Sequence, residues 1–183
     1  YCHRYSEGIH VGYRYYDKRE LGPAFPFGFG LSYTTFAYAN LRFNKTLLEE
    51  GESLEVTVDV TNTGATEGKE IVQIYVSPPA GRYARERQSL KAFAKLRLEP
   101  GETRPVTMQL SWDDFAYYDP AFSRWSVHSG VYTICVAASS RDDAAPATEL
   151  PANAPPPYPM VRQDSFSGLL LQHPRHPAPP AAP

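Results

Sequence analysis

The feature that most constrains this chain is a two-residue alternation of apolar and polar side chains, which recurs through its middle part. It is clearest at residues 54–60, where Leu54, Val56, Val58 and Val60 are separated by charged or hydroxyl residues. Side chains of a β-strand point alternately to opposite faces, so this pattern predicts a strand with one buried face. No stretch shows a convincing helical period, and we therefore expect a protein built from strands.

Further strand candidates share this alternation or are rich in β-branched and aromatic residues, and they lie at residues 37–43, 71–76, 90–98, 106–110, 125–127 and 132–138. About seven short strands separated by turn residues predict an all-β fold, a two-sheet antiparallel sandwich of the immunoglobulin or fibronectin type III kind. The residues expected to fill its core are Leu54, Val56, Val58, Val60, Val72, Ile74, Leu96, Val106, Met108, Trp125, Ile134 and Val136. A segment of roughly 105 residues can hold such a core.

An aromatic-rich arm, residues 1–34, precedes the predicted sandwich. It contains so many tyrosines and phenylalanines that leaving their rings in water would be costly. Within residues 25–36, Pro26, Gly28 and Gly30 are interleaved with aromatic residues, and these residue types argue against regular helix or a central strand. We expect an extended N-terminal arm that includes an ordered loop held by packed rings.

The composition changes from residue 142 onward, because 11 of the 18 prolines fall in the last 42 residues. This segment lacks the apolar periodicity that could offset the entropy of ordering it. The sequence therefore predicts a sandwich over residues 35–141 and a Pro/Ala-rich disordered C-terminal tail over residues 142–183.

The arm also holds the candidates for substrate binding, which are Tyr13, Arg14, Tyr15 and Tyr16. Flat rings stack on sugar faces, and an arginine side chain can hydrogen-bond sugar hydroxyls. The alternative role for these residues is packing against another domain, which the number of rings and their polar tips favours.

No catalytic residue, metal site or cofactor is predicted in this chain. Asp113 and Asp114 are adjacent and would point to opposite faces of an extended chain, whereas glycosidase carboxylates face one ligand across roughly 5 to 9 Å. The five histidines show no metal-ligand spacing. Cys135 alternates away from the expected core and has no assigned basic neighbour, so we expect no nucleophilic role for it.

A basic stretch at residues 82–97 contains four arginines, two lysines and a single acidic residue, Glu86. Such a stretch is usually a solvated edge or an ion-pair surface, and an interface with an acidic neighbouring domain is the alternative. The whole chain has a net charge of −2 and a pI near 6.2, which indicate no nucleic-acid partner and no anionic membrane partner. No apolar run approaches the ~20 residues of a transmembrane helix.

Several longer motifs resemble a known family. The arm reads "YSEGIHVGYRYYD" and is followed by "FPFGFGLSYTTFAYANLRF". Together they resemble the segment by which family 3 glycoside hydrolases, the β-glucosidase and β-xylosidase group, pass from an α/β sandwich domain into a C-terminal fibronectin type III-like domain. The motifs "VTVDVTNTGATEGKEIVQIYVSPP", "LKAFAKLRLEPGET" and "WSVHSGVYTICVAASS" resemble successive strands of that domain. The resemblance covers about residues 5–140.

The resemblance implies an accessory C-terminal module that braces the upstream catalytic domains of a longer parent chain, with the arm as the link. The parent would be a retaining exo-glycosidase with a β-glucoside or β-xyloside substrate. In that family the nucleophilic aspartate and the acid/base glutamate lie upstream of these motifs, so no residue of this chain corresponds to either. The resemblance alone favours a secreted, extracellular or periplasmic location. The alternative is a stand-alone β-sandwich that binds carbohydrate or protein.

Overall fold

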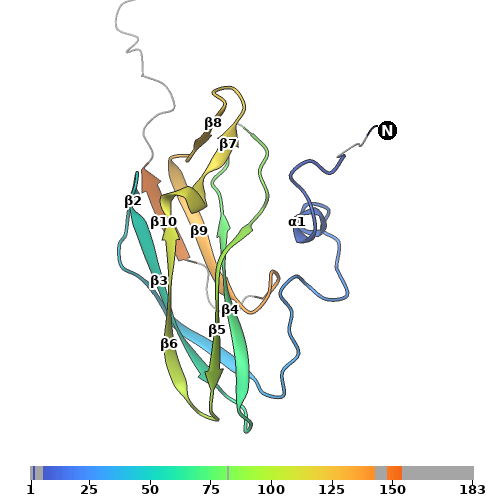
Figure 1. Cartoon of the computed structure of the whole chain (residues 1–183), viewed down its shortest axis with the longest axis vertical. Helices are drawn as coiled ribbons and strands as arrows, with labels where there is room; N and C mark the ends of the chain where they lie inside the picture. The colour runs from blue at the N-terminus through green and yellow to red at the C-terminus, as the bar shows by residue number, and fades with distance from the viewer. Residues whose placement is uncertain (1, 3–5, 82, 143–147, 154–183) are drawn as a thin grey trace, which may run out of the picture.

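The computed structural model describes residues 2, 6–81, 83–142 and 148–153, and most of its regular structure is β-strand. Two sheets pack face to face as the layers of a sandwich (Figure 1). The first is antiparallel, has the order β1-β3-β6, and consists of β1 (Phe36–Phe43), β3 (Ser53–Asn62) and β6 (Thr103–Ser111). The second has the order β2-β10-β9-β4-β5 and consists of β2 (Leu48–Glu49), β10 (Thr148–Asn153), β9 (Gly130–Ala137), β4 (Gly68–Ser77) and β5 (Ser89–Leu98).

Smaller elements lie outside these two sheets. The chain leaves β6 through a short 3₁₀ helix, η1 (Trp112–Phe115), and enters a hairpin of β7 (Tyr117–Asp119) and β8 (Arg124–Ser126). The arm contains one short helix, α1 (Tyr13–Lys18), which the sequence does not predict because six residues are too few to show a helical period. In the described part of the chain, no helix has the length and apolar character needed to cross a bilayer.

The core lies between the two sheets and is formed by the alternating apolar residues. Eleven of the twelve predicted core residues are buried, and those of β3 are completely buried. The prediction of an all-β two-sheet sandwich is therefore confirmed. Trp125 is the exception, because its side chain is 70% exposed. The reason is that β8 belongs to the hairpin, which lies at one end of the sandwich and outside its two packed sheets (Figure 1).

The predicted boundary of the sandwich at residue 141 is wrong, because Thr148–Asn153 form strand β10. This strand pairs antiparallel with β9 and parallel with β2, and it buries Leu150 and Ala152. Its alternation is short and interrupted by Pro151, so the proline-rich composition hides it from sequence reading. Residues 143–147 and 154–183 lie outside the described residues, and the prediction that they are disordered stays a prediction.

Asn62, the last residue of β3, joins the two sheets to the end of the arm. Its Oδ1 accepts hydrogen bonds from the Thr34 hydroxyl at 2.6 Å and from the Gly64 N–H at 3.1 Å. Its Nδ2 donates to the backbone oxygens of Thr66 at 2.9 Å and Leu98 at 3.1 Å. All four positions of the buried amide are therefore satisfied, as a buried polar group requires.

Candidate functional site

The arm lies beside β4 and β5 of the five-stranded sheet (Figure 1), and it contacts the outer face of β4 and the edge strand β5. Residues 72–76 of β4 are all buried, although alternate side chains of this strand point away from the core. Gln73 and Tyr75 are the outward-pointing members, and they are only 3% and 0% exposed. We call the contact between residues 13–28 of the arm and this face of the sheet the seam.

Tyr13 is the aromatic residue that fills the seam. Its ring stacks on Phe27 with centroids 4.9 Å apart and meets the edge of Tyr75 at 6.1 Å. Its hydroxyl oxygen accepts a hydrogen bond from the backbone N–H of Leu90 at 2.9 Å, on edge strand β5. The ring of Tyr13 therefore holds the arm against the sandwich of this same chain, whereas the sequence favours packing against another domain for these rings.

Gln73 is the central polar residue of the seam. Its Nε2 donates hydrogen bonds to the backbone oxygens of Gly28 in the arm and of Ala138 beyond β9. Its Oε1 accepts one from the Tyr75 hydroxyl at 2.6 Å, and burial raises the pKa of Tyr75, so this hydroxyl stays protonated as a donor. Gly28 has a φ of 81°, and a Cβ at this position would overlap the Gln73 amide. The close approach of the loop therefore requires glycine.

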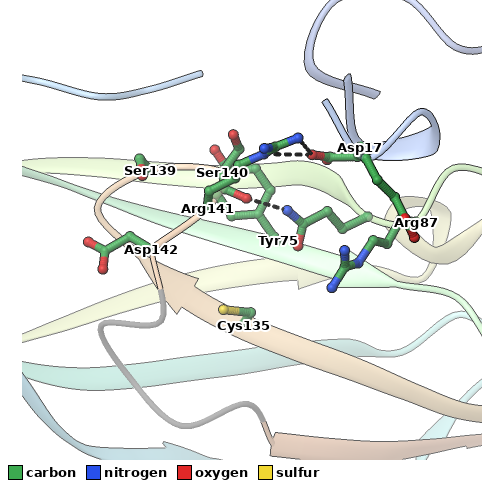
Figure 2. Close-up of a pocket in the computed structure, with 10 residues that line it drawn as sticks. Asp17, Tyr75, Arg87, Cys135, Ser139, Ser140, Arg141 and Asp142 are labelled. Atoms are coloured by element: carbon green, nitrogen blue, oxygen red, sulfur yellow. Dashed lines mark hydrogen bonds and ion pairs between the residues drawn. The ribbon is translucent and has the colours of Figure 1, made fainter. Parts of the chain in front are cut away.

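An ion pair closes the other side of the seam, as Figure 2 shows. Both Nε and Nη2 of Arg141 lie 3.2 Å from Oδ1 of Asp17, the buried residue of α1. The backbone N–H of Ser140 donates to the Phe27 oxygen at 2.8 Å. A hollow of about 350 Å³ lies next to this pair and is lined by polar and charged groups of both arm and sandwich, including Arg87 and Cys135.

The other tyrosines proposed for substrate binding remain at the surface of α1. Tyr15 and Tyr16 are 37% and 43% exposed and meet edge to face at 6.2 Å. The guanidinium of Arg14 lies 5.9 Å from the centre of the Tyr13 ring. The four candidates are thus adjacent in space, but Tyr13 points into the seam while Tyr15 and Tyr16 reach solvent.

Exposed apolar side chains are concentrated on the arm. In the described part of the chain, ten of the sixteen large apolar side chains that are exposed lie between residues 9 and 33. Phe25 and Phe29 pair with centroids 5.4 Å apart, and Leu31 and Tyr33 are 91% and 98% exposed. We call these ten residues the arm surface: Ile9, Val11, Tyr15, Tyr16, Leu21, Phe25, Phe27, Phe29, Leu31 and Tyr33. Exposed apolar side chains gathered on one segment are typical of an interaction site.

The described carboxylates include Asp114, which has a structural role at the end of β6. Asp114 caps η1, because its Oδ2 accepts hydrogen bonds from the backbone N–H of Ser111 at 2.7 Å and from the Ser111 hydroxyl at 2.8 Å. Among the residues that the structure describes, no group of three or more His, Cys, Asp or Glu side chains is placed to hold a metal ion.

The basic stretch at residues 82–97 is divided between two environments. Arg97 forms an exposed ion pair with Glu67, as expected for an ion-pair surface. Arg85 is different, because its side chain is only 11% exposed and its guanidinium lies 5.2 Å from the centre of the Tyr117 ring. The pKa of Glu86, the neighbour of Arg85, is lowered. Burial alone would raise this pKa, but the hydrogen bonds from the Glu86 backbone and from Ser89, together with the positive charge of Arg85, outweigh burial. Arg85 is therefore not part of a solvated edge, but it does form an ion pair, with Glu86 at 3.7 Å. Arg82 lies outside the described residues.

Comparison with known proteins agrees with this architecture. The model of the fibronectin type III-like domain family matches residues 70–140. The thermostable beta-glucosidase B of Acetivibrio thermocellus is 44% identical over 138 residues, which cover 75% of this chain and 18% of that protein. The beta-glucosidase of Rhizobium radiobacter is 45% identical over 139 residues, which cover 76% of this chain and 17% of that protein.

Solved structures show the same similarity. The GH3 beta-glucosidase of Bifidobacterium adolescentis superposes with a TM-score of 0.78 at 39% identity, over 88% of this chain and 24% of that one. Beta-glucosidase 3B of Thermotoga neapolitana superposes with a TM-score of 0.73 at 40% identity, over 80% of this chain and 20% of that one. The chain therefore carries a fibronectin type III-like domain. This domain is that of the family 3 glycoside hydrolases, and the resemblance read from the motifs is confirmed. The chain spans less than a fifth of the length of the two curated relatives.

Proposed function

We propose that this chain is the accessory module of a family 3 glycoside hydrolase and braces the catalytic domains through the arm surface, without catalysing a reaction itself. The observation that carries this proposal is the two-sided character of the arm. Its inner side is fastened to the sandwich by Tyr13, Gly28 and Asp17, while its outer side presents the exposed rings. An ordered, apolar, unpartnered surface is suited to permanent contact with another protein surface.

The chemistry of the arm surface supports a protein partner. Aromatic residues are enriched at the centres of protein interfaces, and a stable interface buries about 800 Å² on each partner. Ten exposed large side chains, each able to bury on the order of 150 Å² or more when aromatic, are sufficient for an interface of that size. Leu31 and Tyr33, the two most exposed residues of the arm surface, are the anchors we expect to contribute most.

The substrate class follows from the relatives. The curated relatives and solved structures named above are beta-glucosidases, so the parent enzyme of this module is proposed to hydrolyse β-glucosides. The same proposal places the nucleophile and the acid/base residue in the catalytic domains and gives this chain a structural role. The purified chain should then show no turnover of an aryl β-glucoside above the rate in buffer.

A chimaeric enzyme tests the bracing function. The matching region of the full-length Acetivibrio thermocellus enzyme is replaced by this chain, and the melting temperature and the hydrolysis of an aryl β-glucoside are measured. The paired change Leu31→Asp and Tyr33→Asp should lower the melting temperature and the activity. Phe93→Asp is the matched control, because Phe93 is 69% exposed but belongs to β5 and is not one of the ten residues of the arm surface. Equal effects of the paired change and of the control, or no effect of either, would refute the proposal.

A further inference from the structure

The hairpin at the end of the sandwich carries a second pair of exposed aromatic residues. Tyr118 of β7 and Trp125 of β8 are directly opposite each other in the pairing of the two strands. They are 50% and 70% exposed, and their ring centroids are 5.8 Å apart at an interplanar angle of 75°. Two large rings therefore stand together in water on one face of a two-stranded sheet.

The opposite face of the hairpin is fastened to the sandwich. Tyr117 stacks on His128 with centroids 4.8 Å apart and planes 5° from parallel. Asp119 is 3% exposed, and its Oδ1 accepts hydrogen bonds from the Tyr83 hydroxyl at 3.1 Å and from the backbone N–H of Ala121 at 2.9 Å. A two-stranded hairpin alone is marginally stable. These contacts hold it in place, so the exposed rings are preorganised for a ligand.

The size of the aromatic pair indicates what kind of ligand it fits. Two aromatic side chains bury about 300–500 Å² together, which is well below the ~800 Å² that each partner of a stable protein interface contributes. Ser123, in the turn between β7 and β8, is exposed and polar. The pair is therefore too small for a protein partner and matches a ligand of the size of one or two sugar rings.

We propose that Tyr118 and Trp125 bind a segment of a neutral β-linked glucan chain. A β-glucose ring carries its hydroxyls around its rim, which leaves two flat C–H faces that stack on an aromatic ring. The rim hydroxyls can hydrogen-bond the Tyr118 hydroxyl. The choice of glucan rests on the β-glucosidase function proposed above, whereas the aromatic site itself is independent of the arm surface.

Electrophoresis of the whole chain through gels that contain soluble mixed-linkage β-glucan tests this site. Gels with dextran, an α-linked glucan, and gels without polymer are the references. We expect the β-glucan to retard the chain, and we expect Trp125→Ala to weaken the association about tenfold, the loss of one aromatic contact. Tyr118→Ala should weaken it as well. Phe93→Ala is the matched control, since it removes a ring of the same exposure from β5 and should leave the retardation unchanged.

Intrinsic fluorescence gives a second readout, because Trp112 and Trp125 are the two tryptophans of the chain and Trp112 is half-buried. The β-glucan should change the emission of the chain and should not change that of Trp125→Ala. Absence of retardation in the native chain, equal retardation by dextran, or an equal loss in Phe93→Ala would overturn the proposal. Melting curves show whether each variant is folded, and Tyr118→Ala serves as the independent variant if Trp125→Ala is not.

The two proposals can fail separately. The paired change at Leu31 and Tyr33 should leave β-glucan retardation unchanged, because those residues lie on the arm. If Trp125→Ala destabilises the chimaeric enzyme as strongly as the paired change does, the hairpin is a protein contact and the glucan site is refuted. If β-glucan does not retard the native chain while the paired change still destabilises the chimaeric enzyme, only the proposal of a glucan site is refuted.

Discussion

Arg141 places both Nε and Nη2 at 3.2 Å from a single oxygen of Asp17, although the two residues are 124 positions apart in the sequence. This contact fastens α1 to the loop that follows β9. The carboxylate of Asp17 is nearly inaccessible to water, so it depends on the guanidinium for compensation.

Arg141→Ala should therefore release α1 from the sandwich. We expect a loss of about 1–2 kcal/mol in the stability of the arm, because a hydrogen-bonded charge loses its partner. Hydrogen exchange of residues 13–21 and tryptic cleavage after Lys18 or Arg19 measure this release. Arg97→Ala, which removes an exposed ion pair with Glu67, is the control and should alter neither. Unchanged protection of α1 in Arg141→Ala would contradict the prediction.

Gly28→Ala should destabilise the seam. A residue with a Cβ loses about 1–2 kcal/mol of stability when it adopts the positive φ of Gly28. The added methyl group would also displace the Gln73 amide. Gly30→Ala is a matched control two residues away, because a Cβ there meets open space and its φ is not in the left-handed region. Urea denaturation of both variants measures the difference, and equal stabilities would show that the loop does not need glycine at position 28.

Asn62→Ala should destabilise the whole sandwich by about 2–3 kcal/mol, since several buried backbone groups lose their partner. Asn62→Asp should also be destabilising, because a carboxylate cannot donate to the oxygens of Thr66 and Leu98. The control is Gln109→Ala on β6. The Gln109 side chain makes one exposed hydrogen bond with Ser53, so its removal should lower the free energy of unfolding by less than about 0.5 kcal/mol. Thermal denaturation measures all three, and a melting temperature of Asn62→Ala equal to that of the control would refute the prediction.

The stability of the chain should fall in acid partly through Asp59. Hydrogen bonds from Asn40 and Arg42 lower the pKa of Asp59, so the folded state binds its proton less strongly than the unfolded state does. Its contribution is therefore present above the ordinary aspartate pKa of about 4 and disappears as the pH falls through the lower, folded value. Urea denaturation from pH 6 to pH 2 measures the free energies of unfolding of the native chain and of Asp59→Asn. The two values should differ near pH 6 and converge in acid. Curves that stay parallel over this range would contradict the assignment.

The isolated chain should self-associate through the arm surface, because exposed apolar patches promote contact between molecules. Light scattering after size-exclusion chromatography should give a mass above the monomer value of 20.5 kDa at high concentration. The paired change Leu31→Asp and Tyr33→Asp should restore the monomer mass, while Phe93→Asp should not. A native chain that remains monomeric at high concentration would contradict this prediction.

Much of the fold could be predicted because its signals are local. The alternation in β3 and in β9 identifies which side chains enter the core, and eleven of the twelve predicted core residues are buried. Trp125 was misplaced because a tryptophan in a strand has the same sequence pattern whether the strand joins a sheet or a separate hairpin. β10 was missed because its pairing with β9 and β2 outweighs a proline-rich composition, and pairing between distant strands is not visible in a local window.

The aromatic composition of the arm predicts packing against another domain, and that stays a prediction. It does not distinguish Tyr13, which fills the seam with the sandwich, from Tyr15 and Tyr16, which reach solvent. Gln73 and Arg141 carry no sequence signal, since an isolated glutamine in a strand or arginine in a loop is ordinarily a surface residue.

By itself, the sequence determined that this chain forms a β-sandwich of the fibronectin type III-like kind with an aromatic arm, because periodicity and composition act over a few residues at a time. Only the tertiary structure decided how the arm is held and which of its rings remain exposed. The reason is that those properties depend on contacts such as Gln73 with Gly28 and Arg141 with Asp17, which exist once distant segments have been brought together by the burial of the core.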